Sequence, residues 1–301
     1  MKAATKFLNH ETNPNEQSTL QRETLQTMTS PTSSNEFNTP IKQIFFDCDN
    51  TLVDTETIAV EAADIVINRV LADKSIDTTY NIEQLIAKYF GLTARQMIVE
   101  LQKELDFTLT ADETKAYTTF EEDLIIDLLH QNPRPCEGIQ GVLARLSAGG
   151  RYRLAVVSSS PIRRIRAALE ACDIAQYFAP DQVFSAKSSM PTPKSKPDPA
   201  IYQWAMAKNE VTADQCIAFE DSRSGARSAI EAGIACVAYV VAYGSEWHRQ
   251  QVAETLMGEG CEMVMRDYGC FFECLGNVER EMVRKQREGA IDEVIALWQA
   301  Q

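Results

Sequence analysis

The sequence of 301 residues has no long hydrophobic run and fewer basic than acidic residues. No apolar stretch approaches the ~18 residues that a membrane-spanning helix needs, and the N-terminal segment has no apolar core of the kind found in secretion signals. The chain has 29 Lys and Arg residues and 43 Asp and Glu residues, so its formal net charge is −14. Because such a surface repels nucleic acids and anionic lipids, we expect no nucleic acid and no membrane among the partners.

The eight cysteines form no C-x-x-C pair, which is the spacing of redox motifs and of many zinc sites. A metal cluster built from Cys261, Cys270 and Cys274 has no supporting partner spacing. Most of the cysteines lie among apolar neighbours, as buried free thiols do. We therefore expect reduced cysteines and a cytoplasmic protein.

Residues 41–55 combine a strand pattern with an acidic turn. The apolar run 44–46 predicts a buried parallel strand, and ligands of open α/β sheets lie just beyond the carboxyl ends of strands. Asp47 and Asp49 follow this run, and two carboxylates so close repel each other unless a cation or a shared proton lies between them. The pair suggests a metal site, an acid/base pair or both, although a turn with solvated acids is an equally common structure.

Three later segments place polar groups at strand ends or in a rigid loop. The apolar run 154–157 ends in three serines, 158–160. The segment 194–199 puts Lys196 in a Pro-flanked loop, directly before a predicted helix. The apolar run 216–219 ends in Glu220 and Asp221. The chain therefore carries, in order, Asp-x-Asp-x-Thr, Ser, Lys-Pro and Glu-Asp.

This order resembles the four motifs of the haloacid-dehalogenase-like (HAD) superfamily. Within it, the chain is similar to the helical-cap (C1-type) phosphatases, a group with phosphoglycolate phosphatase and the β-phosphoglucomutase-like proteins. The resemblance covers residues from about 42 to 275. It implies an α/β fold, with a Rossmann-like parallel sheet core and an inserted small helical cap domain.

The residue pattern agrees with this organisation. Helical periodicity from 55 to about 132, with Thr93 and Thr110 as helix caps, separates the first strand from alternating helices and strands that predict a parallel sheet. We expect a disordered leader, a core domain, a cap domain and a C-terminal helix that packs on the core, or else on a second subunit in a weak homodimer. Their bounds are 1–38 for the leader, 39–54 and 136–275 for the core, 55–135 for the cap and 276–301 for the helix.

The resemblance implies a role for each acidic motif residue. Asp47 would be the nucleophile that forms an aspartyl phosphate. Mg²⁺ would be held by the Asp47 and Asp221 side chains and the Asp49 backbone carbonyl, with Glu220 as a further ligand or in an outer position. The Asp49 side chain would then act as general acid and base.

The remaining motif residues would bind the phosphate or shape the loops. Lys196, with Lys187 and Lys194 as rivals, would pair with the nucleophile and the phosphate. A phosphate oxygen would accept hydrogen bonds from Ser158 and from the backbone amides of Cys48 and Asp49. Ser159 would be a further substrate contact, and Thr51 would brace the first loop. Ser222 and Gly225 would shape the turn after the metal ligands.

The cap would select the substrate. The segment 90–95 resembles the specificity loop of this cap class, with Thr93 and Arg95 as candidate contacts, although a surface Arg in a first helical turn is common. An acid at Asp49 favours phosphate-ester hydrolysis or a mutase, and residues 55–68 lack the His that the related mutases carry. We therefore expect a phosphatase of a small phosphate ester. The alternatives are a sugar-phosphate mutase and a non-catalytic interaction protein with this fold.

Overall fold

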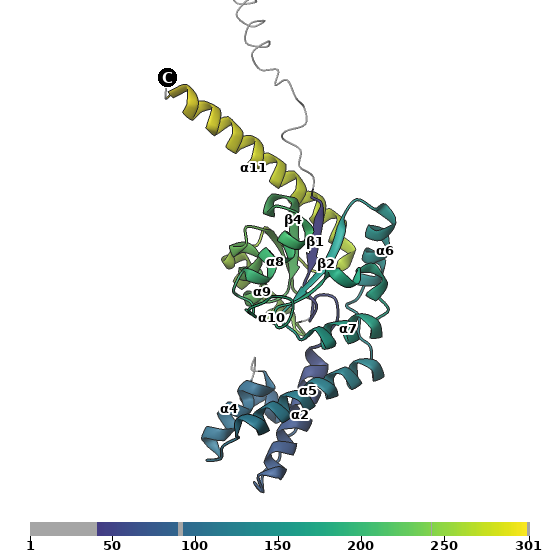
Figure 1. Ribbon diagram of the computed structural model, residues 1–301, viewed down its shortest axis with the longest axis vertical. Helices are drawn as coiled ribbons and strands as arrows, with labels where there is room; N and C mark the ends of the chain where they lie inside the picture. The colour runs from purple at the N-terminus through teal and green to yellow at the C-terminus, as the bar shows by residue number, and fades with distance from the viewer. Residues whose placement is uncertain (1–40, 90–92, 242, 300–301) are drawn as a thin grey trace, which may run out of the picture. The chain divides into compact units, whose positions relative to one another are not determined.

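The computed structural model describes residues 41–89, 93–241 and 243–299. Its centre is a six-stranded sheet in the order β3-β2-β1-β4-β5-β6, in which every pair of neighbours is parallel. Figure 1 shows β1 between β2 and β4. The strands are β1 (Gln43–Phe46), β2 (Arg153–Ser158), β3 (Val183–Ser185), β4 (Cys216–Glu220), β5 (Ala235–Tyr239) and β6 (Met263–Met265). Phe46 pairs with Val156 of β2 and Phe219 of β4, so the carboxyl ends of these three strands meet at one edge.

Both faces of the sheet are buried, as expected of a parallel sheet with near-continuous apolar strands. Side chains alternate along β1, so that Ile44 and Phe46 pack into one hydrophobic cluster and Phe45 packs into another. The Phe46 ring stacks on the rings of Phe219 and Phe271, with centroids 5.4 and 6.0 Å apart.

Helices supply the other half of each cluster. They are α6 (Ile139–Gly149), α7 (Ile162–Ala171) and α11 (Phe271–Gln299) for the first, and α8 (Ala200–Asn209), α9 (Arg223–Glu231) and α10 (Glu246–Glu259) for the second. This alternation of strands and helices confirms the predicted α/β Rossmann-like fold. The final helix begins at Phe271, earlier than predicted, because Phe271, Leu275 and Val278 are all buried in the first cluster.

The segment between β1 and β2 is helical. It contains α2 (Glu56–Asp73), α3 (Ile82–Tyr89), α4 (Ala94–Glu104) and α5 (Ala111–Gln131), and α2 packs on α4 and α5 (Figure 1). Thr93 and Thr110 form the predicted caps, each in a reciprocal capping box. A third hydrophobic cluster, with Ile67, Leu71 and Leu101, lies among these helices.

This helical segment is also anchored to the sheet. Ile58 at the start of α2 and Leu129 at the end of α5 belong to the first hydrophobic cluster of the sheet. The separate third cluster supports the prediction of a cap domain over 55–135, which stays a prediction.

The predicted leader, 1–38, lies outside the described residues. All eight cysteines are described as free thiols, buried except for the partly exposed Cys270, as the sequence predicted. Within the described ranges, no helix combines the length and the apolar character that crossing a bilayer requires.

Candidate active site

The first acidic motif lies in a tight turn that continues the pairing of β1. The backbone amide of Asp47 donates to the carbonyl of Phe219 at 3.0 Å, which carries the β1–β4 ladder one residue further. Asn50 then adopts a left-handed conformation, with φ at 58°, and its amide donates to the carbonyl of Val53 at 2.7 Å. Asn tolerates this conformation better than most residues, so the sequence folds the chain back at this position.

Lys196 lies against the predicted nucleophile. Its Nζ donates to Asp47 Oδ1 and Glu220 Oε1, both at 2.6 Å, and to the carbonyl of Val157 at 2.8 Å. These three acceptors match the three protons of the ammonium group. Burial favours the neutral amine, but the carboxylates of Asp47 and Glu220 raise the pKa of Lys196 above its ordinary value. Lys196 is therefore a permanent buried cation.

The two rival lysines lie elsewhere. Lys187 is exposed, and the exposed Lys194 pairs with Asp198 at 3.1 Å. The structure therefore brings Lys196, and neither rival, to Asp47, as the Pro-flanked sequence suggested.

Three buried carboxylates surround this one lysine. Asp47, Glu220 and Asp221 each offer an oxygen within 4.8 Å of the others. Burial raises the pKa of Asp47 to about 7, with Glu220 and Asp49 acting in the same direction against Lys196. Burial, reinforced by Asp47 and Glu220, also raises the pKa of Asp221. The cluster carries more negative charge than Lys196 neutralises, so it can hold a metal ion.

Glu220 is fixed in place by its neighbours. Its Oε1 accepts hydrogen bonds from Lys196 and from the Tyr202 hydroxyl, whereas its Oε2 has no partner among the described residues. A Cβ atom on Gly225 would lie 1.8 Å from this Oε2. Only glycine leaves room for the Glu220 carboxylate, which explains the predicted importance of Gly225. Ser222 caps the same turn, because its side chain accepts from the Gly225 amide at 3.1 Å.

The Asp49 side chain is held by three donors to which the motifs assign no role. Its Oδ1 accepts from Thr55 Oγ1 at 2.9 Å and from Arg164 Nη2 at 2.6 Å, and its Oδ2 accepts from Ser160 Oγ at 2.6 Å. Burial would raise the pKa of Asp49, but Arg164 and these hydroxyls outweigh it and lower the pKa below its ordinary value. In this state Asp49 is an ionised hydrogen-bond acceptor.

The other predicted contacts have local partners. Ser158 is buried, and its Oγ accepts from the Ser160 amide at 3.0 Å, as a turn-capping serine does. Ser159 is half-buried beside it. Cys48 is buried, and its carbonyl accepts from the amide of Val53 at 3.1 Å. The Thr51 carbonyl accepts from the Tyr268 hydroxyl at 2.6 Å, so Thr51 braces its loop through its backbone.

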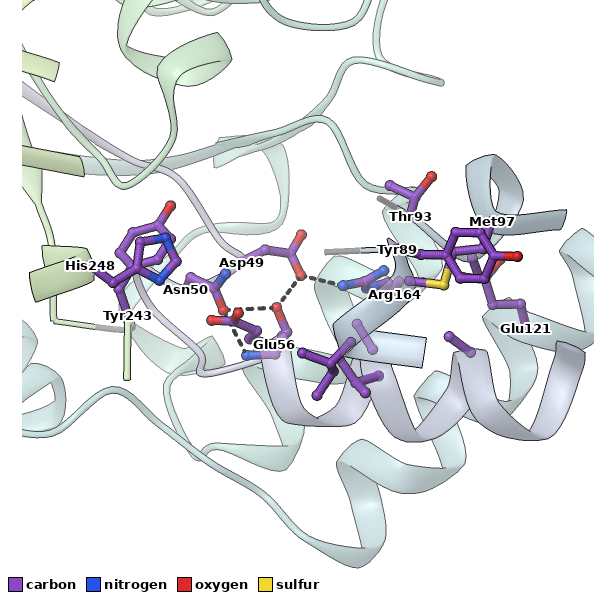
Figure 2. A pocket seen from close by; sticks show the side chains of 16 residues that line it. Asp49, Asn50, Glu56, Tyr89, Thr93, Met97, Glu121, Arg164, Tyr243 and His248 are labelled. Atoms are coloured by element: carbon purple, nitrogen blue, oxygen red, sulfur yellow. Dashed lines mark hydrogen bonds and ion pairs between the residues drawn. The ribbon is translucent and has the colours of Figure 1, made fainter. Parts of the chain in front are cut away.

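Asp49 lines a cleft of about 510 Å³, which lies between this edge of the sheet and the helical segment. Figure 2 shows Asp49 and Arg164 between Tyr243 and His248 on one side and Tyr89 and Met97 on the other. The wall from the helices is largely apolar. The residues from this segment that line the cleft are Glu56, Ala59, Val60, Ala63, Ile86, Tyr89, Thr93, Ala94, Met97 and Glu121.

The predicted specificity loop is only partly described, because residues 90–92 lie outside the described ranges. Thr93 lines the cleft, although its hydroxyl is used in capping α4. Arg95 lines a separate cavity of about 240 Å³ among the helices, with Ile98 and Tyr117. The structure therefore brings Thr93 to the cleft with Asp49 and does not bring Arg95 there.

Arg164, Tyr243 and His248 are site residues that the motifs did not single out. Arg164 lies in the first turn of α7, six residues after Ser158, a position that points back towards the end of β2. The Tyr243 hydroxyl donates to the Asp221 carbonyl at 3.1 Å, and its ring lies 5.0 Å from the ring of His248. The His248 position, far from the first motif in sequence, gave no signal of its own.

Residues 44–239 match the family described as "Haloacid dehalogenase-like hydrolase". The chain belongs to this family, which confirms the resemblance drawn from the four motifs. Among curated proteins, it is 30% identical over 194 residues to the 6-phosphogluconate phosphatase of Escherichia coli K12, covering 64% of this chain and 80% of that protein. It is also 30% identical over 208 residues to a phosphoglycolate phosphatase of Nitrosospira multiformis, covering 67% of this chain and 86% of that protein.

Solved structures share the fold at lower identity. A HAD hydrolase of Entamoeba histolytica matches with a TM-score of 0.63 and 19% identity, covering 81% of this chain and 99% of that chain. A HAD family hydrolase of Deinococcus radiodurans, with bound phosphate and sodium, matches with a TM-score of 0.58 and 20% identity, covering 79% and 98%. The family is a family of hydrolases, and these curated relatives of the chain are named as phosphatases. Both findings agree with the predicted class of enzyme, a HAD-like phosphoric monoester hydrolase.

Proposed function

We propose that this protein is a Mg²⁺-dependent phosphatase that hydrolyses a small phosphate monoester through an aspartyl phosphate on Asp47. The observation that carries the proposal is the buried Lys196, 2.6 Å from Asp47, inside a cluster of three carboxylates at the edge of a parallel sheet. Phosphoryl transfer depends mainly on positioning and charge, and this arrangement supplies both.

The carboxylate cluster fits a hard cation that prefers oxygen ligands. The Asp47 and Asp221 side chains and the Asp49 carbonyl would hold Mg²⁺, which would neutralise charge between the nucleophile and the phosphate. Glu220 suits an outer position better, because Lys196 and Tyr202 occupy its Oε1 and its Oε2 lies against Gly225. The buried Glu220 then holds Lys196 in place.

Asp47 would attack phosphorus as an ionised carboxylate, so it needs no activating base. Lys196 would stabilise the charge that builds up on the transferring group. Ser158, with the amides of Cys48 and Asp49, would hold a phosphate oxygen. The Ser158 hydroxyl accepts from the Ser160 amide and keeps its own proton to donate to that oxygen.

Asp49 would protonate the leaving oxygen and later take a proton from the attacking water. Its lowered pKa suits the second of these steps. The first step needs a protonated carboxyl, and the negative charge of a bound phosphate raises the pKa of a nearby acid.

A sugar-phosphate mutase is the second candidate, because the structure brings a histidine to the cleft. Residues 55–68 lack the His that the related mutases carry, yet His248 of α10 lines the cleft with Asp49. The ring of His248 packs near Tyr243, on the side of the cleft that bears Asp221. A histidine there could orient a second hydroxyl of a sugar.

One experiment tests the proposal and separates the two candidates. The purified protein is incubated with p-nitrophenyl phosphate and with hexose 1-phosphates, with Mg²⁺ or with EDTA, and followed by ³¹P NMR. We expect free phosphate to appear only with Mg²⁺. Formation of a hexose 6-phosphate faster than free phosphate would favour the mutase, and equal phosphate release in EDTA would overturn the metal assignment.

A further inference from the structure

Arg164 is the one Arg or Lys among the described residues that line the cleft (Figure 2). Its side chain is 18% exposed, and its Nη2 donates to Asp49 Oδ1 at 2.6 Å. In the described part of the chain its Nε has no hydrogen-bond partner. A guanidinium carries five N–H donors in a fork that matches a carboxylate, and Asp49 engages the fork through one nitrogen.

The rest of the charge in this cleft is mostly negative. Asp49 lies at its floor, and Glu56 of α2 and Glu121 of α5 lie on its wall. Burial raises the pKa of Glu121, whereas Arg164 and Lys187 act to lower it. Arg164 is therefore the fixed cation towards which a second anionic group of a ligand would be drawn.

We infer that Arg164 binds a carboxylate on the leaving group, so that the substrate is the phosphate monoester of a hydroxy acid. The inference rests on the proposed function, in which Asp49 contacts the leaving oxygen. Because Arg164 lies one hydrogen bond beyond Asp49, it meets the part of the substrate that follows this oxygen. The carbon chain between the two groups would pack on apolar residues such as Val60 and Met97.

A purely structural role for Arg164 makes a different prediction. If Arg164 only fixes Asp49, its loss lowers the hydrolysis of every ester by the same factor. If it binds a carboxylate, its loss lowers the hydrolysis of carboxylate esters more than that of matched alcohols. The ratio of kcat/KM values within a matched pair separates the two roles.

The experiment uses two pairs of phosphate esters. Within each pair, one ester has a carboxylate where the other has a hydroxymethyl group. They are 2-phosphoglycolate with ethylene glycol monophosphate, and 6-phosphogluconate with sorbitol 6-phosphate. Hydrolysis is measured with Mg²⁺ for the wild type, Arg164→Gln, Arg164→Lys and Arg166→Gln. Arg166 is an exposed residue of the same helix and is not one of the described residues that line the cleft, so its variant controls for the change in charge.

We expect the wild type to prefer the carboxylate member of at least one pair by roughly tenfold to a hundredfold, the range that charge-assisted hydrogen bonds supply. Arg164→Gln should bring this ratio close to one, Arg164→Lys should keep part of it, and Arg166→Gln should leave it unchanged. A wild-type ratio near one in both pairs, or a ratio that survives in Arg164→Gln, would overturn the inference.

Hydrolysis of p-nitrophenyl phosphate shows whether the inference about Arg164 alone is wrong or the proposed function is wrong as well. If the wild type hydrolyses that ester without preferring carboxylates, the proposed function stands and the inference is wrong. If it hydrolyses neither that ester nor any member of the two pairs, the proposed function fails and the inference fails with it.

Discussion

Gly225→Ala tests how closely the site is packed, because its expected effect is opposite in sign to that of an ordinary helical Gly→Ala change. Gly225 lies in α9, where alanine would normally stabilise a helix by up to about 1 kcal/mol. Here the new Cβ would lie 1.8 Å from Glu220 Oε2 and 2.4 Å from its Cδ. The Glu220 carboxylate would have to move by about an ångström to restore an ordinary contact, which would disturb the bonds of its Oε1 with Lys196 and Tyr202.

The magnitude follows from two contributions. Forcing extra atoms into a packed interior costs about 1–3 kcal/mol. Weakening the charge-assisted bond between Glu220 and Lys196 costs roughly 1.5–3 kcal/mol more. Since part of the strain relaxes, we expect Gly225→Ala to lower the free energy of unfolding by about 2–4 kcal/mol and to lower kcat.

The assay is urea unfolding followed by circular dichroism, together with p-nitrophenyl phosphate hydrolysis. Gly141→Ala is the matched control, because Gly141 lies inside α6 and a Cβ atom added there would meet no described heavy atom within 4 Å apart from its chain neighbours and the nearby backbone of its own helix. It should be neutral or stabilising and fully active. In a Glu220→Ala background the clash disappears, so Gly225→Ala should cost much less there. A Gly225→Ala protein with wild-type stability and activity would refute the reasoning.

Three further predictions concern the charges of the site. Asp221→Ala should raise the Mg²⁺ concentration needed for half-maximal activity, because a hard cation loses a charged ligand, and an unchanged Mg²⁺ titration would show that Asp221 is structural. Lys196→Ala should lower the free energy of unfolding in EDTA by about 3–5 kcal/mol, because it leaves Asp47 and Glu220 buried without a cation. Lys194→Ala, at an exposed residue, is the control, and equal losses in both variants would contradict the account. The pKa of Asp47 is raised from 3.8 to about 7, so the folded state binds the proton more tightly than the unfolded state does. The stability that this proton gives the metal-free protein should be complete below pH 4 and lost as the pH rises to about 7. Urea midpoints in EDTA should show this loss for the wild type and a smaller one for Asp47→Asn, and identical slopes for the two proteins would argue against it.

The fold was predictable because its signals are local. The strand run 44–46 and the capping residues Thr93 and Thr110 act within a few residues, and the strand and the helices that they begin agree with the structure. The start of α11 was missed because Phe271 and Leu275 are fixed by packing on the sheet, which residue spacing alone does not encode.

The site was predictable where a motif fixes both the residue and its place at a strand end. Asp47, Lys196, Glu220 and Asp221 come together as the order of the motifs implied. Arg164 and His248 could not be found in this way, because α7 and α10 bring them to the cleft only through the packing of helices on the sheet. Arg95 shows the converse, since a plausible residue type in a plausible loop lines a different cavity.

The central claim is that Asp47 is the nucleophile, and the most direct test is the steady-state rate of p-nitrophenyl phosphate hydrolysis by Asp47→Asn with saturating Mg²⁺. The substitution keeps the shape of the side chain but replaces one carboxylate oxygen with a neutral amide. We predict that a variant folded like the wild type by circular dichroism shows no turnover. Hydrolysis at the wild-type rate by this folded variant would contradict the account.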